Sequence, residues 1–476
     1  MVYPLGSKKT KTLSVFIVLI LTFLGGAHLI EMQTPPPTPL NLQEDVITDE
    51  QTPEWKGVAG RPINQTENSI AIAVCSEYYG SAFDTPINAA KGLEALTEIA
   101  ETDINQYCES NGLTLRFDFI PFPVQADAET LIEATDYLEE NGVRLVIGYD
   151  YTTTKVFNHL AEKDMFFISP GLTTTRLTDD PDNLYGVRPV IPDGEVVPSI
   201  LRSKSIKALV VLQNGFEISY EQHGTLLEDT YNEIADLFVS GDGVIYKRVF
   251  YPQPSIISSM MEENEDYTQY LAEADAAVGE ALQLYGEGKV GVLVVGFGEA
   301  HVLAYQSKDM EHLLNVPWFM ALEMGDARMG LEAGEYTSKA KFYSSREIVE
   351  HPETLRALEE RVNQKLRDWK VSWPNYTLEP YDGIKYDACW LMALSVIEAN
   401  SSEPSEVKAV FGVVSSSYDG INGNYALDEH GDKAHFLVGV TEIVDDLATE
   451  SYLSVQIGTY NSVTDEVTYH EARPII

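Results

Sequence analysis

Short apolar runs alternate with longer amphipathic stretches along most of this chain, from residue 69 to about residue 321. The runs are rich in Val, Ile, Leu and Phe, a pattern typical of strands buried on both faces. The predicted strands are Ser69–Cys75, Thr114–Phe122, Val143–Gly148, Phe166–Ser169, Ala208–Gln213, Val244–Phe250, Gly291–Gly296 and Trp318–Ala321. Helical spacing predicts helices between them, for example at Pro86–Cys108, Ala128–Asn141, Tyr220–Phe238 and Tyr267–Tyr285. This alternation predicts an α/β fold in which helices cover parallel sheets on both faces.

The pattern changes after Glu323 and becomes mainly helical. Arg346–Trp369 holds many charged residues, whereas Tyr386–Ala399 is strongly apolar. The chain then ends in strand-like segments, and Gly and Asn mark turns between residues 418 and 440. Residues 428–432 predict the loop between two paired strands.

The N-terminus carries the pattern of an exported protein. Lys8, Lys9 and Lys11 precede an uncharged, mostly apolar run at Leu13–Ile30. This run predicts a signal peptide or an N-terminal membrane anchor over residues 1–31, with the lysines on the cytoplasmic side and the rest of the chain outside. Residues 32–68 are rich in Pro and acidic residues without apolar periodicity, which predicts a disordered stalk.

Composition limits the class of protein and its partners. The 476 residues are 44% hydrophobic, which is ample for a packed core and favours two lobes. Acidic residues outnumber basic ones 74 to 32, and the formal net charge of −42 argues against binding nucleic acid. A solvated acidic surface explains this excess better than a calcium-binding surface, because no loop has the spacing of an EF-hand.

Cysteine is scarce, so a disulfide scaffold is excluded. Only Cys75, Cys108 and Cys389 are present, and at most one intramolecular disulfide can form. Cys75 and Cys108 lie in a predicted strand and the helix after it, where they could be neighbours. We favour buried free thiols.

No motif predicts catalysis, a metal or a cofactor. Gly296-Phe297-Gly298 follows a predicted strand as in a dinucleotide fingerprint, but His301 occupies the third glycine position. The chain has no P-loop, no G-x-S-x-G elbow and no H-E-x-x-H motif, and its nine His are scattered without ligand spacing. The sequence therefore predicts a protein that is not an enzyme.

Two predicted strands run directly into loops rich in hydroxyl groups. LVIGYDYTTT begins at Leu145 and FFISPGLTTT begins at Phe166. In a parallel sheet the loops at the carboxyl ends of strands line the ligand crevice, where hydroxyl and backbone N–H groups can hold a carboxylate. Ordinary turn and helix-capping chemistry is the alternative explanation for these threonines.

The order of these pieces resembles the type I periplasmic solute-binding proteins of ABC transporters, in the branch similar to the Leu/Ile/Val-binding protein. The matching segments, in family order, are Tyr78-Tyr79-Gly80, Asp103-Ile104-Asn105, ISPGLTTTRLT at Ile168–Thr178, YGVRPVIPD at Tyr185–Asp193, YDACWLMA at Tyr386–Ala393 and the G-x-x-G-x-Y-x-x-D-E-x-G-D segment at Gly420–Asp432. The resemblance implies two Rossmann-like lobes joined by three hinge crossings. Lobe I is expected at residues 69–191 and 326–421, and lobe II at 192–325 and 422–476.

The resemblance also implies ligand-binding residues on lobe I. The loop after the strand that begins at Val143 supplies a hydroxyl to the ligand carboxylate, which corresponds here to Thr153 with Thr152 as its neighbour. The next loop supplies backbone groups and a second hydroxyl, at Gly171 and Thr173. Tyr78 is expected to cover the ligand from the same lobe.

Lobe II is expected to complete the site. Tyr220 corresponds to an aromatic residue of the family, and Glu323 corresponds to an acidic residue that accepts hydrogen bonds from the ligand's ammonium group. Phe297 lies in a loop that faces the same cleft. For Glu323 the alternative is an ordinary surface carboxylate, and for Tyr78 it is an ordinary packing residue.

These expectations describe a receptor that captures an amino acid or a related amide by hinge closure and delivers it to an ABC permease. The receptor would be extracytoplasmic, tethered to the membrane by its N-terminal segment or secreted after cleavage. One alternative is a sensory ectodomain that signals through a separate partner, although no second membrane-spanning pattern is seen. The other is an amidase or similar hydrolase on a doubly wound fold.

Overall fold

The computed structural model describes thirteen ranges of the chain: residues 69–78, 86–125, 128–148, 154–171, 186–187, 193–215, 224–252, 266–296, 299–321, 326–371, 376–428, 431–446 and 451–474. The predictions for residues 1–31 and 32–68 lie outside these ranges. None of the helices in these ranges combines the length and the apolarity needed to cross a bilayer.

The first sheet has five parallel strands in the order β2-β1-β3-β4-β5. They are β1 (Ser69–Tyr78), β2 (Arg116–Gln125), β3 (Leu145–Ile147), β4 (Phe166–Ile168) and β5 (Gly186–Val187). Side chains alternate along β1, so Ile72 and Val74 belong to one core and Ala71 and Ala73 to another. Each face of this sheet therefore needs its own layer of helices.

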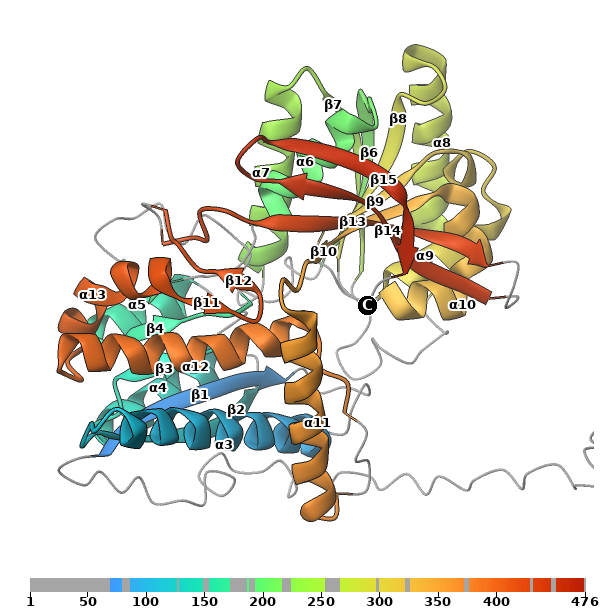
Figure 1. Ribbon diagram of the computed structural model, residues 1–476. Coiled ribbons are helices and arrows are strands. Elements are labelled where there is room, and N and C mark those ends of the chain that lie inside the picture. The colour runs from blue at the N-terminus through green and yellow to red at the C-terminus, as the bar shows by residue number, and fades with distance from the viewer. Residues whose placement is uncertain are drawn as a thin grey trace, which may run out of the picture. The chain divides into compact units, whose positions relative to one another are not determined.

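Helices from both ends of the chain supply these layers (Figure 1). One face packs on α3 (Pro86–Ser110), α12 (Pro380–Ala399) and α13 (Pro404–Ser417). The other face packs on α4 (Ala128–Glu140) and α5 (Thr154–Glu162). The helix α11 (Pro352–Asp368) packs outside α3 through a separate apolar cluster.

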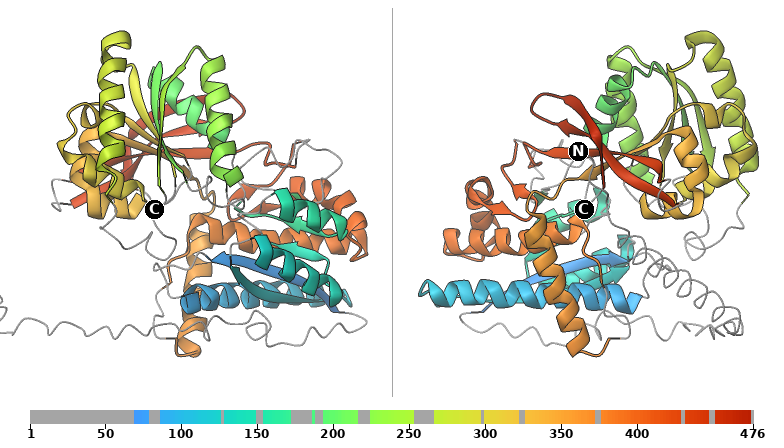
Figure 2. Two further views of the ribbon diagram at one scale, coloured as in Figure 1. Left: turned by 180° about the vertical axis from the view of Figure 1, so that it is seen from behind. Right: turned by 45° about the vertical axis from the view of Figure 1, so that its right-hand side comes forward.

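The second sheet has eight strands in the order β15-β14-β13-β10-β9-β8-β6-β7. The parallel strands are β6 (Ala208–Asn214), β7 (Val244–Tyr251), β8 (Val290–Val295), β9 (Trp318–Ala321) and β10 (Phe342–Glu347). The antiparallel strands are β13 (Leu437–Asp446), β14 (Ser451–Asn461) and β15 (Glu466–Pro474), drawn in red in Figure 2. The C-terminal segments thus extend a parallel sheet by a meander.

Helices also cover both faces of the second sheet. One face packs on α6 (Asp193–Ser203) and α7 (Gly224–Ser240). The other packs on α8 (Thr268–Tyr285), α9 (Ala300–Gln306) and α10 (Asp326–Ala340), with the short 3-10 turns η5 (Ser307–Asp309) and η6 (Leu313–Asn315) nearby. The predicted α/β class, with parallel-rich sheets, is confirmed.

The chain passes between the two sheets three times. It leaves the first sheet after β5, returns after β10, and leaves again after the hairpin of β11 (Asp419–Gly420) and β12 (Gly423–Asn424). An isolated bridge pairs Leu427 with Lys433 on the third crossing, and the loop predicted at residues 428–432 lies partly outside the described residues. The topology therefore has the three crossings that the resemblance implied.

The predicted boundaries of the lobes need correction. Residues 326–347 were expected in lobe I, but β10 pairs with β9 and β13 of the second sheet, and α10 packs on that sheet. The strand β10 was not predicted from the sequence because it carries two polar residues, Ser344 and Ser345, although both are buried. The Ser344 and Thr441 hydroxyl groups satisfy each other at 2.7 Å. The later boundary at residue 421 is also too early, because Tyr425 still packs in the core of the first sheet.

The three cysteines are buried thiols outside any disulfide, as favoured from the sequence. Cys75 faces α4 and α5, whereas Cys108 and Cys389 lie in the core on the opposite face of the first sheet. Burial raises the pKa of the Cys108 and Cys389 thiols. All three act as small apolar core residues.

Candidate ligand-binding site

The carboxyl ends of three strands of the first sheet lie side by side. Val74 of β1 is in register with Ile147 of β3, and Ile147 with Ile168 of β4. Tyr78 ends β1 at this edge, although its side chain lies outside the described residues. Gly171 follows β4 and is half-buried at the same edge. The structure therefore brings the backbone of these two predicted site residues to one edge of the sheet.

A single glycine sets the direction in which the chain leaves β3. Gly148 has φ = +128°, a conformation that side-chain-bearing residues rarely adopt. A Cβ atom there would lie 2.5 Å from the carbonyl oxygen of Cys75. Its N–H donates to the Ile168 carbonyl at 2.8 Å, which ties the end of β3 to that of β4. The hydroxyl-rich loop therefore starts from a fixed point on the sheet.

Most of the predicted contact residues lie outside the described residues. These are Thr152, Thr153, Thr173, Tyr220, Phe297 and Glu323. The strands before the second-sheet positions end at Asn214, Val295 and Ala321, all on the parallel part of that sheet. The six assignments stay predictions.

A buried polar cluster ties together three strand ends of the second sheet. Asn214, at the end of β6, donates from Nδ2 to Glu299 Oε1 at 2.6 Å. Tyr251, at the end of β7, donates its hydroxyl to the same oxygen at 2.8 Å. Glu299 follows β8 and is 4% exposed. One carboxylate therefore joins the starting points of three loops at the carboxyl ends of parallel strands.

The close packing of this cluster explains a glycine that the sequence left unassigned. A Cβ atom at Gly296 would lie 2.4 Å from the Tyr251 hydroxyl and 2.6 Å from Glu299 Oε1. Burial and the neighbouring carboxylate raise the pKa of Tyr251 well above its ordinary value, which keeps the hydroxyl a donor. Phe297 was the residue of this loop predicted to contact a ligand, and Glu299 was not predicted. The available signal was an acidic residue four positions after the end of an apolar strand.

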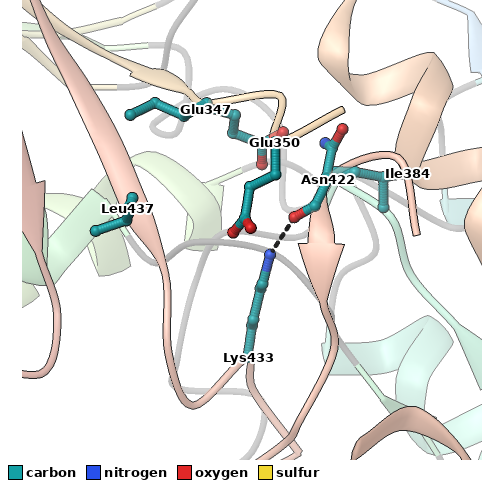
Figure 3. A pocket seen from close by; sticks show the side chains of 7 residues that line it. Glu347, Glu350, Ile384, Asn422, Lys433 and Leu437 are labelled. Carbon is teal, nitrogen blue, oxygen red and sulfur yellow. Dashed lines mark hydrogen bonds between the residues drawn. The ribbon is translucent and has the colours of Figure 1, made fainter. Parts of the chain in front are cut away.

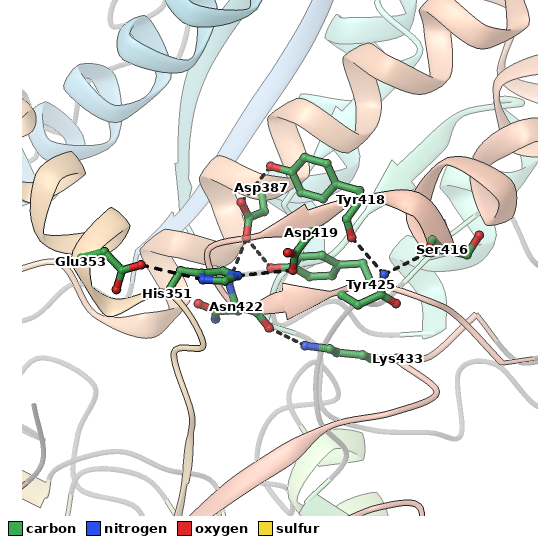
Figure 4. A network of polar contacts seen from close by, with 10 residues as sticks. His351, Glu353, Asp387, Ser416, Tyr418, Asp419, Asn422, Tyr425 and Lys433 are labelled. Carbon is green, nitrogen blue, oxygen red and sulfur yellow. Dashed lines mark hydrogen bonds and ion pairs between the residues drawn. The ribbon is translucent and has the colours of Figure 1, made fainter.

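A second buried carboxylate organises the return from α13 to the third crossing (Figure 4). Asp387 on α12 accepts hydrogen bonds from the Tyr425 hydroxyl at 2.8 Å and the Tyr418 hydroxyl at 3.0 Å. The backbone N–H of Asn422 donates to it at 3.3 Å. Burial raises the pKa of Asp387 to about 6, although these donors favour its charged form.

This cluster accounts for two of the segments that carried the family resemblance. Asp387 belongs to YDACWLMA, and Tyr425 belongs to the segment at 420–432. A Cβ atom at Gly420 would lie 2.5 Å from Asp387 Cγ, so the hairpin approaches the carboxylate only with glycine there. Gly423 adopts φ = +83°. These residue types therefore maintain the hairpin against α12.

Polar groups of the crossings meet around a small pocket (Figure 3). Lys433 is buried and donates from Nζ to the Asn422 carbonyl at 2.8 Å, and burial lowers the pKa of this ammonium group. Glu347, at the end of β10, lines the same pocket. Burial raises its pKa to about 7; Lys433 opposes this shift and Asp193 of α6 adds to it. Groups from all three crossings therefore influence one another electrostatically.

The strand ends of the two sheets offer hydrogen-bond donors and carboxylate oxygens. Among the residues that the structure describes, no group of three or more His, Cys, Asp or Glu side chains could hold a metal ion. The strand ends instead present fixed backbone geometry on the first sheet and a buried carboxylate on the second.

Comparison with known proteins identifies the fold. No protein-family model matches the chain. No curated protein matches its sequence. Solved structures do match, at low sequence identity, and those compared below are substrate-binding or solute-binding proteins of ABC transporters.

A substrate-binding protein from Desulfitobacterium hafniense, in complex with Leu, has a TM-score of 0.56 and 16% identity, covering 81% of this chain and 99% of its own. A leucine-binding protein from Thermotoga maritima has a TM-score of 0.53 and 13% identity, covering 85% of this chain and 99% of its own. A solute-binding protein from R. palustris, in complex with 4-hydroxybenzoate, has a TM-score of 0.59 and 13% identity, covering 82% of this chain and 97% of its own. The chain therefore has the fold of these binding proteins over nearly their whole length.

Proposed function

We propose that this chain is an extracytoplasmic solute-binding protein of an ABC transporter. It captures a small solute and presents the closed, liganded form to a permease. The observation that carries this proposal is the fold itself. Nearly the whole length of several binding proteins matches this chain, and the chain passes between its two sheets three times. The chain binds its solute without transforming it.

The chemistry of the neighbours' ligands supports a solute with a carboxylate group. Leu and 4-hydroxybenzoate, bound by two of the neighbours, differ in size and in charge but share this group. In this chain the hydroxyl-rich loops after β3 and β4 supply the matching donors, through Thr153 and Thr173. Charge-assisted hydrogen bonds from such donors hold a carboxylate without a cationic side chain. An amino acid or a related amide is the solute class we infer first.

Residues that follow strands of the second sheet would determine whether the site prefers an amino acid or an acid without an ammonium group. Glu323, Tyr220 and Phe297 are the proposed contacts from this side. The carboxylate of Glu323 would accept hydrogen bonds from an α-ammonium group, and benzoate offers it no such donor. The ligand contacts both lobes only after closure. Binding therefore shifts the equilibrium toward the closed form.

The N-terminal pattern sets the proposed location. A basic segment followed by an apolar run, and then by a Pro-rich acidic stretch, supports export with either a tether or a cleaved signal. The neighbours are named as proteins of ABC transporters, which favours transport over a sensory role.

Thermal unfolding of the full-length protein with single solutes tests the proposal. L-amino acids, short amides and aromatic acids form the panel, and at least one carboxylate-bearing solute should raise the melting temperature. Thr153→Val should abolish this rise, whereas Thr354→Val, at an exposed position of α11, should preserve it. Glu323→Gln should weaken the binding of an amino acid and leave the binding of an aromatic acid unchanged. A panel without any stabilising carboxylate would overturn the proposal.

A further inference from the structure

A second cavity lies beside the crossing from β10 to α11, on the side of β10 where β13, β14 and β15 follow in the strand order. Its volume is about 230 Å³, and a water molecule needs only roughly 10–15 Å³ of such space. Residues of β10, β13, β14 and β15 form one side, including Arg346 and Arg473. The apolar residues Ile348, Val349 and Pro352 line it as well. The cavity is therefore large enough for a small organic molecule and has an apolar wall.

The positive charge at this cavity is unusual for the chain. Lys and Arg number 32 against 74 acidic residues, yet two guanidinium groups line this one cavity. Arg346 forms an ion pair with Glu379 at 3.0 Å. Arg473 is exposed on β15, and no carboxylate of the described residues is within ion-pair distance of it. Arg473 is therefore the guanidinium that can accept a new anionic partner.

One carboxyl group in the wall changes its charge near neutral pH. Glu347 lines the cavity, and burial raises its pKa to about 7. The charged groups around it are Lys433, which opposes the shift, and Asp193, which reinforces it, with Glu350 and Arg346 nearby on the chain. Below this pH Glu347 is neutral, and the charge of Arg473 is left without an opposing carboxylate at the wall.

We propose that this cavity is a second ligand site, for a small carboxylate with an apolar body, held by the Arg473 guanidinium. An arginine donates two parallel hydrogen bonds to a carboxylate, and the apolar wall accommodates the carbon chain. An inorganic oxyanion shares the charge but would leave the apolar wall in contact with water. None of the described residues that line this cavity belongs to β6, β8 or β9, and none is a proposed contact of the transported solute.

The pH dependence follows from the sign of the neighbouring charge. An anion bound beside Glu347 favours the protonated form of that carboxyl group. As the pH rises through about 7, Glu347 ionises and repels the ligand. Affinity for the carboxylate should therefore be higher at pH 6 than at pH 8, by about fivefold or more for charges a few ångströms apart.

Isothermal titration of the full-length protein with butyrate tests the proposal, with butylamine and inorganic phosphate as comparison probes. Butyrate should bind more tightly than either. Arg473→Gln should lower the affinity for butyrate by about tenfold, which is the loss expected when a charge-assisted hydrogen bond is removed. Arg356→Gln makes the same change in net charge at an exposed position of α11 and should leave the affinity unchanged.

Glu347→Gln provides an independent arm, because it keeps the cavity but removes the titrating group. This variant should bind butyrate equally at pH 6 and pH 8. Equal losses in the two arginine variants, phosphate binding as tight as butyrate binding, or an unaltered pH dependence in Glu347→Gln would each overturn the proposal.

Discussion

Tyr425→Phe removes one hydroxyl from the buried cluster around Asp387 and should destabilise the protein in a pH-dependent way. Tyr425 and Asp387 are both fully buried, and their hydrogen bond is 2.8 Å long. Without the hydroxyl, Asp387 Oδ2 keeps the Asn422 N–H at 3.3 Å, and the backbone N–H of Ile421 also donates to this carboxylate. A buried carboxylate that loses a donor costs about 2 kcal/mol when it is charged and about 1 kcal/mol when it is neutral.

The sign of the pH dependence follows from the raised pKa of Asp387, which is about 6 in the folded protein and 3.8 ordinarily. At pH 5 most of the folded protein holds the proton, and the lost hydrogen bond is a neutral one. At pH 8 Asp387 is ionised, and the lost bond is charge-assisted. The variant should therefore lose about 1 kcal/mol more at pH 8, which corresponds to a further rise in the pKa of roughly 0.7 unit.

Urea unfolding followed by circular dichroism at pH 5 and pH 8 measures this difference. Tyr305→Phe is the matched control, because Tyr305 is 49% exposed and its loss should change the free energy of unfolding by less than about 0.5 kcal/mol. Equal destabilisation by Tyr425→Phe at both pH values would refute the reasoning, since Asp387 would then not ionise between them.

Three further predictions concern packing, thiols and the crossing. Gly420→Ala places a Cβ atom 2.5 Å from Asp387 Cγ and should lower the free energy of unfolding by about 1–3 kcal/mol, whereas Gly412→Ala, in open space on α13, should raise it slightly in the same urea titration. A thiol reagent should label none of the buried cysteines in the native protein and all of them in urea; rapid native labelling would contradict their burial. Glu347→Gln should stabilise the protein at pH 8 by about 2 kcal/mol more than at pH 5, because the wild-type carboxyl group, with a pKa of about 7, is ionised only at the higher pH; equal effects on the urea midpoint would count against that pKa.

Most of the parallel strands could be predicted because strands buried on both faces appear in the sequence as short apolar runs. The strand β8, VGVLVV, is buried at every position, and only a strand or a buried helix segment gives so short an apolar run. The strand β10 was not predicted because Phe342 and Tyr343 are followed by two serines, which interrupt the apolar run. Its burial depends on a hydroxyl partner on β13, nearly a hundred residues later, which no local pattern reveals.

The candidate site was less predictable for a related physical reason. Hydrophobic periodicity locates the strand ends but gives no information about which loop side chain turns toward a ligand. Glu299 illustrates this limit, because its partners Asn214 and Tyr251 are joined to it only by the folding of three βα units. The family resemblance had the opposite weakness. Its segments at 386–393 and 420–432 identified the fold correctly, but their residues around Asp387 maintain a structural contact and do not mark the ligand.

Native mass spectrometry of the full-length protein, mixed with amino acids, short amides and aromatic acids, tests the central claim most directly. We expect one added mass per chain that corresponds to a single carboxylate-bearing solute, and the loss of that mass in Thr153→Val but not in Thr354→Val. A folded protein that retains no solute from the mixture, or one that retains only a solute without a carboxylate group, would contradict it.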